Sequence, residues 1–115
     1  MQEARFRFLD WLLDWLLSLE DFPFDWDAGN ETKSLQKHPI TCEEAEEVFA
    51  TRLFVPLGEQ IEPFPHEPRY GLLGETATGK ALFLVFTIRK ERVRVISVRP
   101  MNAKEKGFYA SLRQK

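Results

Sequence analysis

Two strand-like runs separated by two residues constrain the fold of this chain most. Ala81–Arg89 and Arg92–Arg99 are rich in β-branched and aromatic residues, and Lys90-Glu91 has the length of a tight hairpin turn. Arg69–Glu75 is a third run of this kind, and the turn residues 76–79 follow it. These patterns predict three consecutive antiparallel strands.

With Lys90-Glu91 at the tip, the predicted cross-strand pairs are Ile88 with Val93, Phe86 with Val95, and Leu84 with Ser97. Alternation then gives one apolar face, which carries Leu82, Leu84, Phe86, Ile88, Val93 and Val95 and ends at Ser97 and Arg99. The other face carries Phe83, Val85, Ile96 and Val98 and, toward the tip, Thr87, Arg89, Arg92 and Arg94. Three arginines near one end form a patch that would bind a phosphate backbone by charge and forked hydrogen bonds. Alternatively, this is a solvated strand end whose arginines pair with acidic side chains.

The N-terminal stretch is predicted to be a helix from about Ala4 to Leu19. Its polar residues fall three or four apart and form one stripe, made of Arg7, Asp10, Asp14 and Ser18. The apolar arc around the stripe is wider than a surface helix needs to pack on one core. Either the helix is sandwiched within the fold, or its second face meets another chain. A membrane surface is a third possibility, which the acidic stripe argues against.

Three further helices are predicted from residues that can cap a helix end. They span about Asp27–Lys37, Cys42–Ala50 and Ala103–Leu112. The aromatic run Phe22–Asp27 is expected to be a short edge strand, where Pro is tolerated, and the proline-rich residues 56–68 are expected to form a loop. The order of elements predicts an α+β fold, with an antiparallel sheet and helices mainly on one face.

Charge is distributed unevenly along the 115 residues. Residues 1–50 contain 4 Lys/Arg and 12 Asp/Glu, whereas residues 51–115 contain 12 Lys/Arg and 6 Asp/Glu. Such asymmetry is a hint of interaction with a polyanion, although the two halves could also neutralise each other within one fold. The length predicts a single domain, which we divide into a helical extension at residues 1–21 and a core at residues 22–115.

Several classes of protein are excluded or disfavoured by the composition. The single cysteine, Cys42, excludes an internal disulfide framework and a multi-cysteine zinc site. No apolar run approaches the roughly 20 residues that a membrane-spanning helix needs. The N-terminus has no small-residue cleavage site of a secretory signal, so we expect the cytoplasm to be the compartment.

Three parts of the sequence resemble the BrnT-type toxins. The first part comprises Phe24-Asp25-Trp26-Asp27, Lys37-His38-Pro39-Ile40-Thr41 and Glu43–Phe49. The second, Arg69 with Gly74 and then Thr76 and Gly79, looks like the middle strand and turn of the family. The third is the Arg94–Glu105 run with Tyr109 behind it, which is similar to the C-terminal signature of the family. The resemblance covers roughly Phe24 to Leu112. It implies a RelE-like fold, a metal-independent endoribonuclease that inhibits translation, and neutralisation by a BrnA-type ribbon-helix-helix antitoxin.

RNA cleavage without a metal needs a base for the ribose 2′-OH, cations around the phosphorane and an acid for the leaving 5′-oxygen. The expected phosphate clamps, which stay protonated throughout the accessible pH range, are Arg69, Arg94 and Arg99. The candidates for proton transfer are Lys37, His38, Glu105 and Tyr109, of which His38 titrates nearest neutrality. Further contacts with RNA are expected from Arg89, Arg92 and Lys104. No metal site or cofactor is expected.

Each of these candidates also has a structural interpretation. His38 could cap the carbonyl groups at a helix end, Tyr109 could pack the last helix onto the sheet, and Lys37 could be solvated. Arg99 alternates to the face opposite Arg94, so the two converge only if the strand bulges or Arg99 reaches round the sheet edge.

A second hypothesis assigns the chain a binding role without catalysis. In this hypothesis a RelE-like scaffold self-associates into a homodimer through its N-terminal helix. The broad apolar arc of that helix and the acidic first half of the chain favour this interpretation. Asn30 and Ser34, which stand where the family usually has Lys and Asn, favour it as well.

Overall fold

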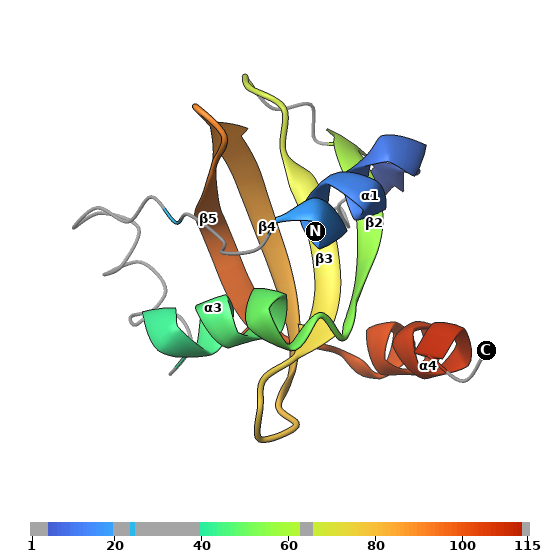
Figure 1. Cartoon of the computed structure of the whole chain (residues 1–115). Helices are drawn as coiled ribbons and strands as arrows, with labels where there is room; N and C mark the ends of the chain where they lie inside the picture. Colours follow the sequence, from blue (N-terminus) through green and yellow to red (C-terminus); the bar gives the residue numbers. More distant parts are fainter. Residues whose placement is uncertain (1–4, 20–23, 25–39, 63–65, 114–115) are drawn as a thin grey trace.

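The chain folds around one antiparallel sheet with helices packed on it, as a computed structural model shows for residues 5–19, 24, 40–62 and 66–113 (Figure 1). The sheet has the order β1-β2-β3-β4-β5. Its strands are β1 (Arg5–Arg7), β2 (Phe54–Glu62), β3 (Tyr70–Glu75), β4 (Ala81–Arg89) and β5 (Arg92–Pro100). The described helices are α1 (Asp10–Ser18), α3 (Cys42–Thr51) and α4 (Ala103–Arg113). This arrangement confirms the predicted α+β class.

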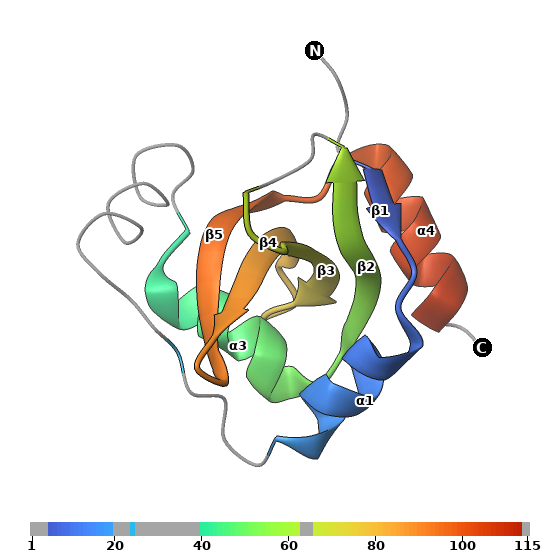
Figure 2. The ribbon, with the colours of Figure 1, turned by 90° about the horizontal axis from the view of Figure 1, so that it is seen from above.

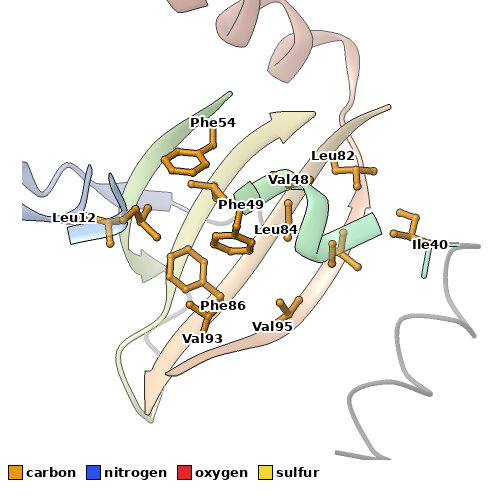
Figure 3. Packing of buried hydrophobic residues seen from close by; sticks show 14 residues of the cluster. Leu12, Ile40, Val48, Phe49, Phe54, Leu82, Leu84, Phe86, Val93 and Val95 are labelled. Atoms are coloured by element: carbon orange, nitrogen blue, oxygen red, sulfur yellow. The ribbon is translucent and has the colours of Figure 1, made fainter. Parts of the chain in front are cut away.

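Helices α1 and α3 cover the same face of the sheet (Figure 2). Phe49 of α3 lies at the centre of the core and packs edge-to-face on Phe86 of β4, with 5.5 Å between ring centroids (Figure 3). Leu12 and Leu16 of α1 are fully buried in the same cluster. Burying large apolar side chains is the main favourable term in folding, so α1 is part of the main core.

A smaller core lies on the other face of the sheet. Its buried members are Leu73, Phe83, Val85, Met101 and Tyr109. Phe6 of β1 packs against this cluster and lies over Gly71, where a Cβ atom would come within 2.6 Å of the Phe6 ring. Strand β1 and helix α4 therefore cover part of the second face.

The predicted caps of α3 and α4 and the predicted hairpin turn are confirmed. Thr41 and Glu44 form a capping box at the start of α3. Asn102 accepts a hydrogen bond from the Glu105 backbone N–H at 2.8 Å, and its own N–H donates to the Glu105 carboxylate at 2.9 Å. Both turn residues of the β4–β5 hairpin have positive φ, as a type I′ turn requires, with 50° at Lys90 and 64° at Glu91.

The prediction of a continuous helix from Ala4 is wrong for its first turn. Residues 5–7 form β1, which pairs antiparallel with β2, and α1 begins only at Asp10. The Arg5-Phe6-Arg7 sequence alternates with period two, so Phe6 points into the second core while the arginines flank it. The chain therefore enters the sheet before the helix begins.

The prediction of a loop at residues 56–68 is wrong for its first part, because Phe54–Glu62 is a strand. The register of this strand shifts between Pro56 and Gly58, and an irregularity of this kind is where a sheet accommodates a proline. Gly58 has φ +110°, and a Cβ atom there would lie 1.9 Å from the backbone oxygen of Arg7. Glycine thus allows β1 to pass close to β2.

The predicted helix over residues 27–37 and most of the predicted aromatic strand lie outside the described residues. Phe24, which is described, makes an isolated parallel bridge with Val93 and packs edge-to-face on Phe49. Within the described part of the chain, no helix is long and apolar enough to cross a membrane.

Candidate functional site

A bulge in the β4–β5 hairpin decides which arginines share a face. Near the tip the predicted register is confirmed, with Phe86 opposite Val95. The register then shifts, and Leu84 lies opposite Val98 rather than opposite Ser97 as predicted. One extra residue in β5 exchanges the faces of all residues beyond it. Val98 therefore packs in the main core, where the unbroken alternation had not placed it.

The bulge also moves Arg99 to the face that carries Arg94. Arg99 lies opposite Phe83, and its guanidinium carbon is 4.3 Å from the centroid of that ring. The prediction of Arg99 on the main-core face is thus wrong, because β5 bulges between Val95 and Ser97. Arg94, however, lies opposite Thr87. The span from Phe83 to Thr87 is roughly 13 Å at the usual rise per residue of a strand, so the two arginines share a face but not a site.

Three arginines gather near Glu67 at the tip end of this face, and we call Arg69, Arg89 and Arg94 the arginine cluster. Arg89 donates two hydrogen bonds to the Glu67 carboxylate, one from Nη2 to Oε1 at 2.9 Å and one from Nε to Oε2 at 3.3 Å. These hydrogen bonds are the main reason why the pKa of Glu67 is lowered; slight burial opposes the change, and the charges of Arg89, Arg69 and Arg94 add to it. Three cations thus act on one anionic group.

The strand register places Arg69 within this cluster. Tyr70 lies opposite Phe86, so the preceding residue faces Thr87, and the Thr87 hydroxyl donates to the Pro68 carbonyl at 2.7 Å. The Arg69 Nε atom is buried, and no group in the described part of the chain accepts a hydrogen bond from it. A buried donor without an acceptor is costly, so the Nε–H group of Arg69 is an unsatisfied donor in the free protein.

The hairpin tip adds further positive charge. Arg89 and Arg92 are the last cross-strand pair before the turn, and both side chains are exposed. Like charges directly opposite each other repel, and a bound anion would relieve this repulsion. In Figure 1 the tip and the beginning of β3 lie at the upper end of the sheet, whereas α4 lies at the lower end.

The guanidinium group of Arg99 is engaged by α4. It makes two hydrogen bonds of 2.8 Å to the two carboxylate oxygens of Glu105. Burial acts to raise the pKa of Glu105, but the hydrogen bonds from Arg99 and from the Asn102 backbone, with the Arg99 charge, lower it overall. This carboxylate therefore caps α4 and pairs with Arg99 at the same time.

The hydroxyl group of Tyr109 is also engaged within the fold. It donates to the Leu53 carbonyl oxygen at 2.7 Å and lies 3.0 Å from Glu75 Oε1. The side chain is only 6% exposed and packs in the smaller core. The structure thus brings Tyr109 and Arg99 together around α4, away from the arginine cluster.

Of the other candidates, Lys37 and His38 lie outside the described residues. Lys104 is exposed in the first turn of α4, at the end of the sheet opposite the arginine cluster. Sequence reasoning missed Glu67, which lies in the segment interpreted only as a proline-rich loop. The available signal was an acidic residue two positions before Arg69, at the edge of the most basic part of the chain.

A family described as "Ribonuclease toxin, BrnT, of type II toxin-antitoxin system" matches residues 26–105, well over half of the chain. The matched range includes the arginine cluster and Arg99, and it leaves out β1, α1 and Tyr109. A search of curated proteins found no match. The chain therefore belongs to the BrnT family of ribonuclease toxins from type II toxin–antitoxin systems.

Proposed function

We propose that this protein is a metal-independent endoribonuclease that cleaves RNA and thereby inhibits translation, with the arginine cluster as its phosphate-binding site. The observation that carries the proposal is that Arg89 binds the Glu67 carboxylate through two hydrogen bonds, while Arg69 and Arg94 are near enough for their charges to lower its pKa. A phosphodiester, like a carboxylate, presents anionic oxygens that a guanidinium fork can bind in pairs.

The cluster would act mainly in the transition state of cleavage. Attack of the ribose 2′-oxygen on phosphorus gathers negative charge on the phosphoryl oxygens, and fixed cations stabilise this charge without reorganisation. Arg69 and Arg94 would hold the reacting phosphate, while Arg89 and Arg92 would contact the RNA backbone beside it. Proton transfer is assigned to His38 and Lys37 on the resemblance to the family.

Arg99 and Tyr109 receive a structural role in this proposal instead of the catalytic role that the sequence suggested. The Arg99 fork is filled by Glu105, and the Tyr109 hydroxyl is filled by Leu53 and Glu75. Groups already engaged within the fold must break these bonds before they can bind a substrate. We therefore propose that both side chains hold α4 on the sheet.

The test is cleavage of a single-stranded RNA oligonucleotide in the presence of EDTA. We expect the wild-type protein to cleave, and Arg94→Ala to lower the rate by about 100- to 1,000-fold, as the loss of one preorganised donor typically does. Lys106→Ala, which removes an equal charge from the exposed surface of α4, is the matched control. Full cleavage by the Arg94 variant would reject the assignment of the site.

The partners follow from the same proposal. Membership in a type II family implies an antitoxin and an RNA target. We propose that the antitoxin is a BrnA-like ribbon-helix-helix protein and that the toxin acts in the cytoplasm on a RelE-like scaffold. Growth arrest on expression of the chain, relieved by co-expression of an adjacent ribbon-helix-helix gene, is the expected result. Growth arrest that persists would argue against this partner.

The exposed apolar side of α1 supports a second candidate function, self-association into a homodimer. Leu17 is 47% exposed and Leu13 39%, and Phe8, just before the helix, is 75% exposed, although all three are large and apolar. Because Leu12 and Leu16 are buried in the main core, deleting the helix would damage the fold as well as the surface. A Leu13→Asp, Leu17→Asp double variant tests the surface alone by light scattering. A monomeric wild-type protein would reject self-association.

A further inference from the structure

We propose that Glu67 is an internal substitute for the substrate phosphate: its carboxylate occupies the arginine cluster in the free protein and leaves it when RNA binds. The inference rests on the proposed function for the identity of the ligand, an RNA phosphodiester. It adds a residue that tunes substrate affinity from inside the binding site.

The geometry of the Glu67 contact is that of a bound oxyanion. Arg89 binds the two carboxylate oxygens with two different nitrogen atoms, in the paired arrangement by which guanidinium groups also bind phosphate. Arg69 and Arg94 lie near enough for their charges to act on the same carboxylate. The cluster is therefore already shaped and charged for a small anion.

The contact of Glu67 leaves part of the cluster unused. Both carboxylate oxygens are bound by Arg89, whereas the buried Nε atom of Arg69 has no acceptor among the described residues. A phosphodiester has two anionic oxygens and could accept from Arg89 and, once the Arg69 side chain turns toward solvent, from Arg69 as well, which the carboxylate does not do. A phosphate that binds both arginines therefore satisfies more of the site than Glu67 does.

The carboxylate is also placed where it can leave at low cost. Glu67 lies in the segment between β2 and β3, and its side chain is 36% exposed, against 48% for Arg89. Exposed ion pairs of this kind change an equilibrium constant by less than about tenfold. A phosphate that binds Arg69 as well as Arg89 can displace such a partner.

General-base catalysis is the other role open to a carboxylate at this position. The surrounding arginines lower the pKa of Glu67, which makes it a weaker base than an ordinary glutamate. The same lowering keeps the group ionised at neutral pH, so a competing anion and not a proton is what releases it. Occupation of the phosphate position explains the environment of Glu67 better than proton transfer does.

The experiment compares binding of a 2′-O-methyl RNA oligonucleotide, which cannot be cleaved, by the wild-type protein, Glu67→Gln and Glu59→Gln. Fluorescence anisotropy in EDTA and low salt gives the three dissociation constants. Glu59 pairs with Arg7 at the sheet edge with an N–O distance of 2.9 Å, so its variant controls for the loss of one negative charge. We expect Glu67→Gln to bind about three- to tenfold tighter than both other proteins.

The alternative results separate this inference from the proposed function. If the wild-type protein binds RNA and Glu67→Gln binds equally or more weakly, Glu67 only braces Arg89, and the inference fails while the proposed function stands. If none of the three proteins binds RNA, the proposed function fails, and titration with inorganic pyrophosphate decides the inference. If Glu67→Gln binds pyrophosphate more tightly than the wild-type protein does, the inference that Glu67 occupies an anion site stands. Equal binding by the two proteins, or no binding, overturns it.

Discussion

Arg94 and Arg99 lie on the same strand and, because of the bulge, on the same face of the sheet, yet their surroundings differ in kind. Arg99 stacks on Phe83 and fills its fork with Glu105, a carboxylate whose side chain is only 14% exposed and which also caps α4. Arg94 acts with Arg69 and Arg89 on Glu67, which lies outside the regular strands and helices and is more exposed.

The comparison shows that the role of each arginine depends on how firmly the fold holds its carboxylate partner. Glu105 is fixed three times over, by its helix, by the cap and by the salt bridge, so releasing Arg99 would disturb α4. Glu67 lies outside the helices and strands and is held by its two hydrogen bonds from Arg89. The Arg99–Glu105 pair therefore suits a structural role, and the arginine cluster with Glu67 suits an exchangeable anion site. Four predictions test this contrast.

The largest expected effect is on RNA cleavage by an Arg69→Ala variant. Removing the guanidinium group from the arginine cluster should lower the cleavage rate by about 100- to 1,000-fold. Arg99→Lys, which keeps the charge beside Glu105, should cleave like the wild-type protein. A steady-state assay on one oligonucleotide compares both variants. If the Arg99 variant lost cleavage and the Arg69 variant did not, the substrate-binding role would belong to Arg99 and not to the arginine cluster.

The next effect is on stability, where substitution of Arg99 should matter more than substitution in the arginine cluster. Arg99→Ala removes a two-bond contact and leaves Glu105 without its main partner, which should lower the free energy of unfolding by about 1–3 kcal/mol. Arg94→Ala should lower it by less, because the acidic side chain near Arg94, Glu67, is 36% exposed, whereas Glu105 is 14% exposed. Urea unfolding followed by tryptophan fluorescence measures both. Equal losses in the two variants would contradict the assignment of separate roles.

A smaller loss is expected from Tyr109→Phe. The substitution keeps the aromatic ring in the smaller core but removes the hydroxyl that donates to Leu53, so the free energy of unfolding should fall by about 1 kcal/mol. RNA cleavage should remain, because the hydroxyl is assigned to the attachment of α4. A stable variant that no longer cleaves would restore Tyr109 as a proton donor.

The smallest effect should appear on acidification. The pKa values of Glu44, Glu67 and Glu105 are lowered in the folded protein, Glu44 chiefly by its hydrogen bond from Lys80. A lowered pKa contributes stability that is complete above the ordinary value of 4.5 and is lost as the pH falls below it through the folded value. Unfolding curves between pH 6 and pH 3 should show this decline. In Glu105→Gln the free energy of unfolding should decline less steeply over this pH range than in the wild-type protein. An equally steep decline in the two proteins would contradict the pairing of Glu105 with Arg99.

Much of the fold could be predicted from local patterns in the sequence. The β4–β5 hairpin, its turn, the α3 capping box and the cap of α4 each depend on residues within a few positions of one another. β1 and β2 were missed because their own residues do not indicate strands. Strand β1 is three residues long, and β2 contains a proline and a glycine that normally indicate a loop. Pairing makes both of them strands: β1 pairs with β2 across more than 50 residues, and β2 also pairs with β3, which follows it in the chain.

The candidate site was predicted in its residue types but not in its grouping. Alternation alone predicts that Arg89, Arg92 and Arg94 share a face, and the register of β4 and β5 near the tip agrees. Arg99 could not be placed, because a bulge changes the face of every later residue and leaves no mark in a run of valines and isoleucines. Glu67 could not be assigned to the site, because only the tertiary structure brings its carboxylate to Arg89.

The central claim is that the arginine cluster, and not Arg99, binds an RNA phosphate. The most direct test follows the arginine Nε–Hε signals of the labelled protein by NMR during titration with a 2′-O-methyl RNA dinucleotide. The signals of Arg69, Arg89 and Arg94 should shift together while that of Arg99 stays in place. A shift confined to Arg99 would contradict the claim and move the site to the α4 end of the sheet.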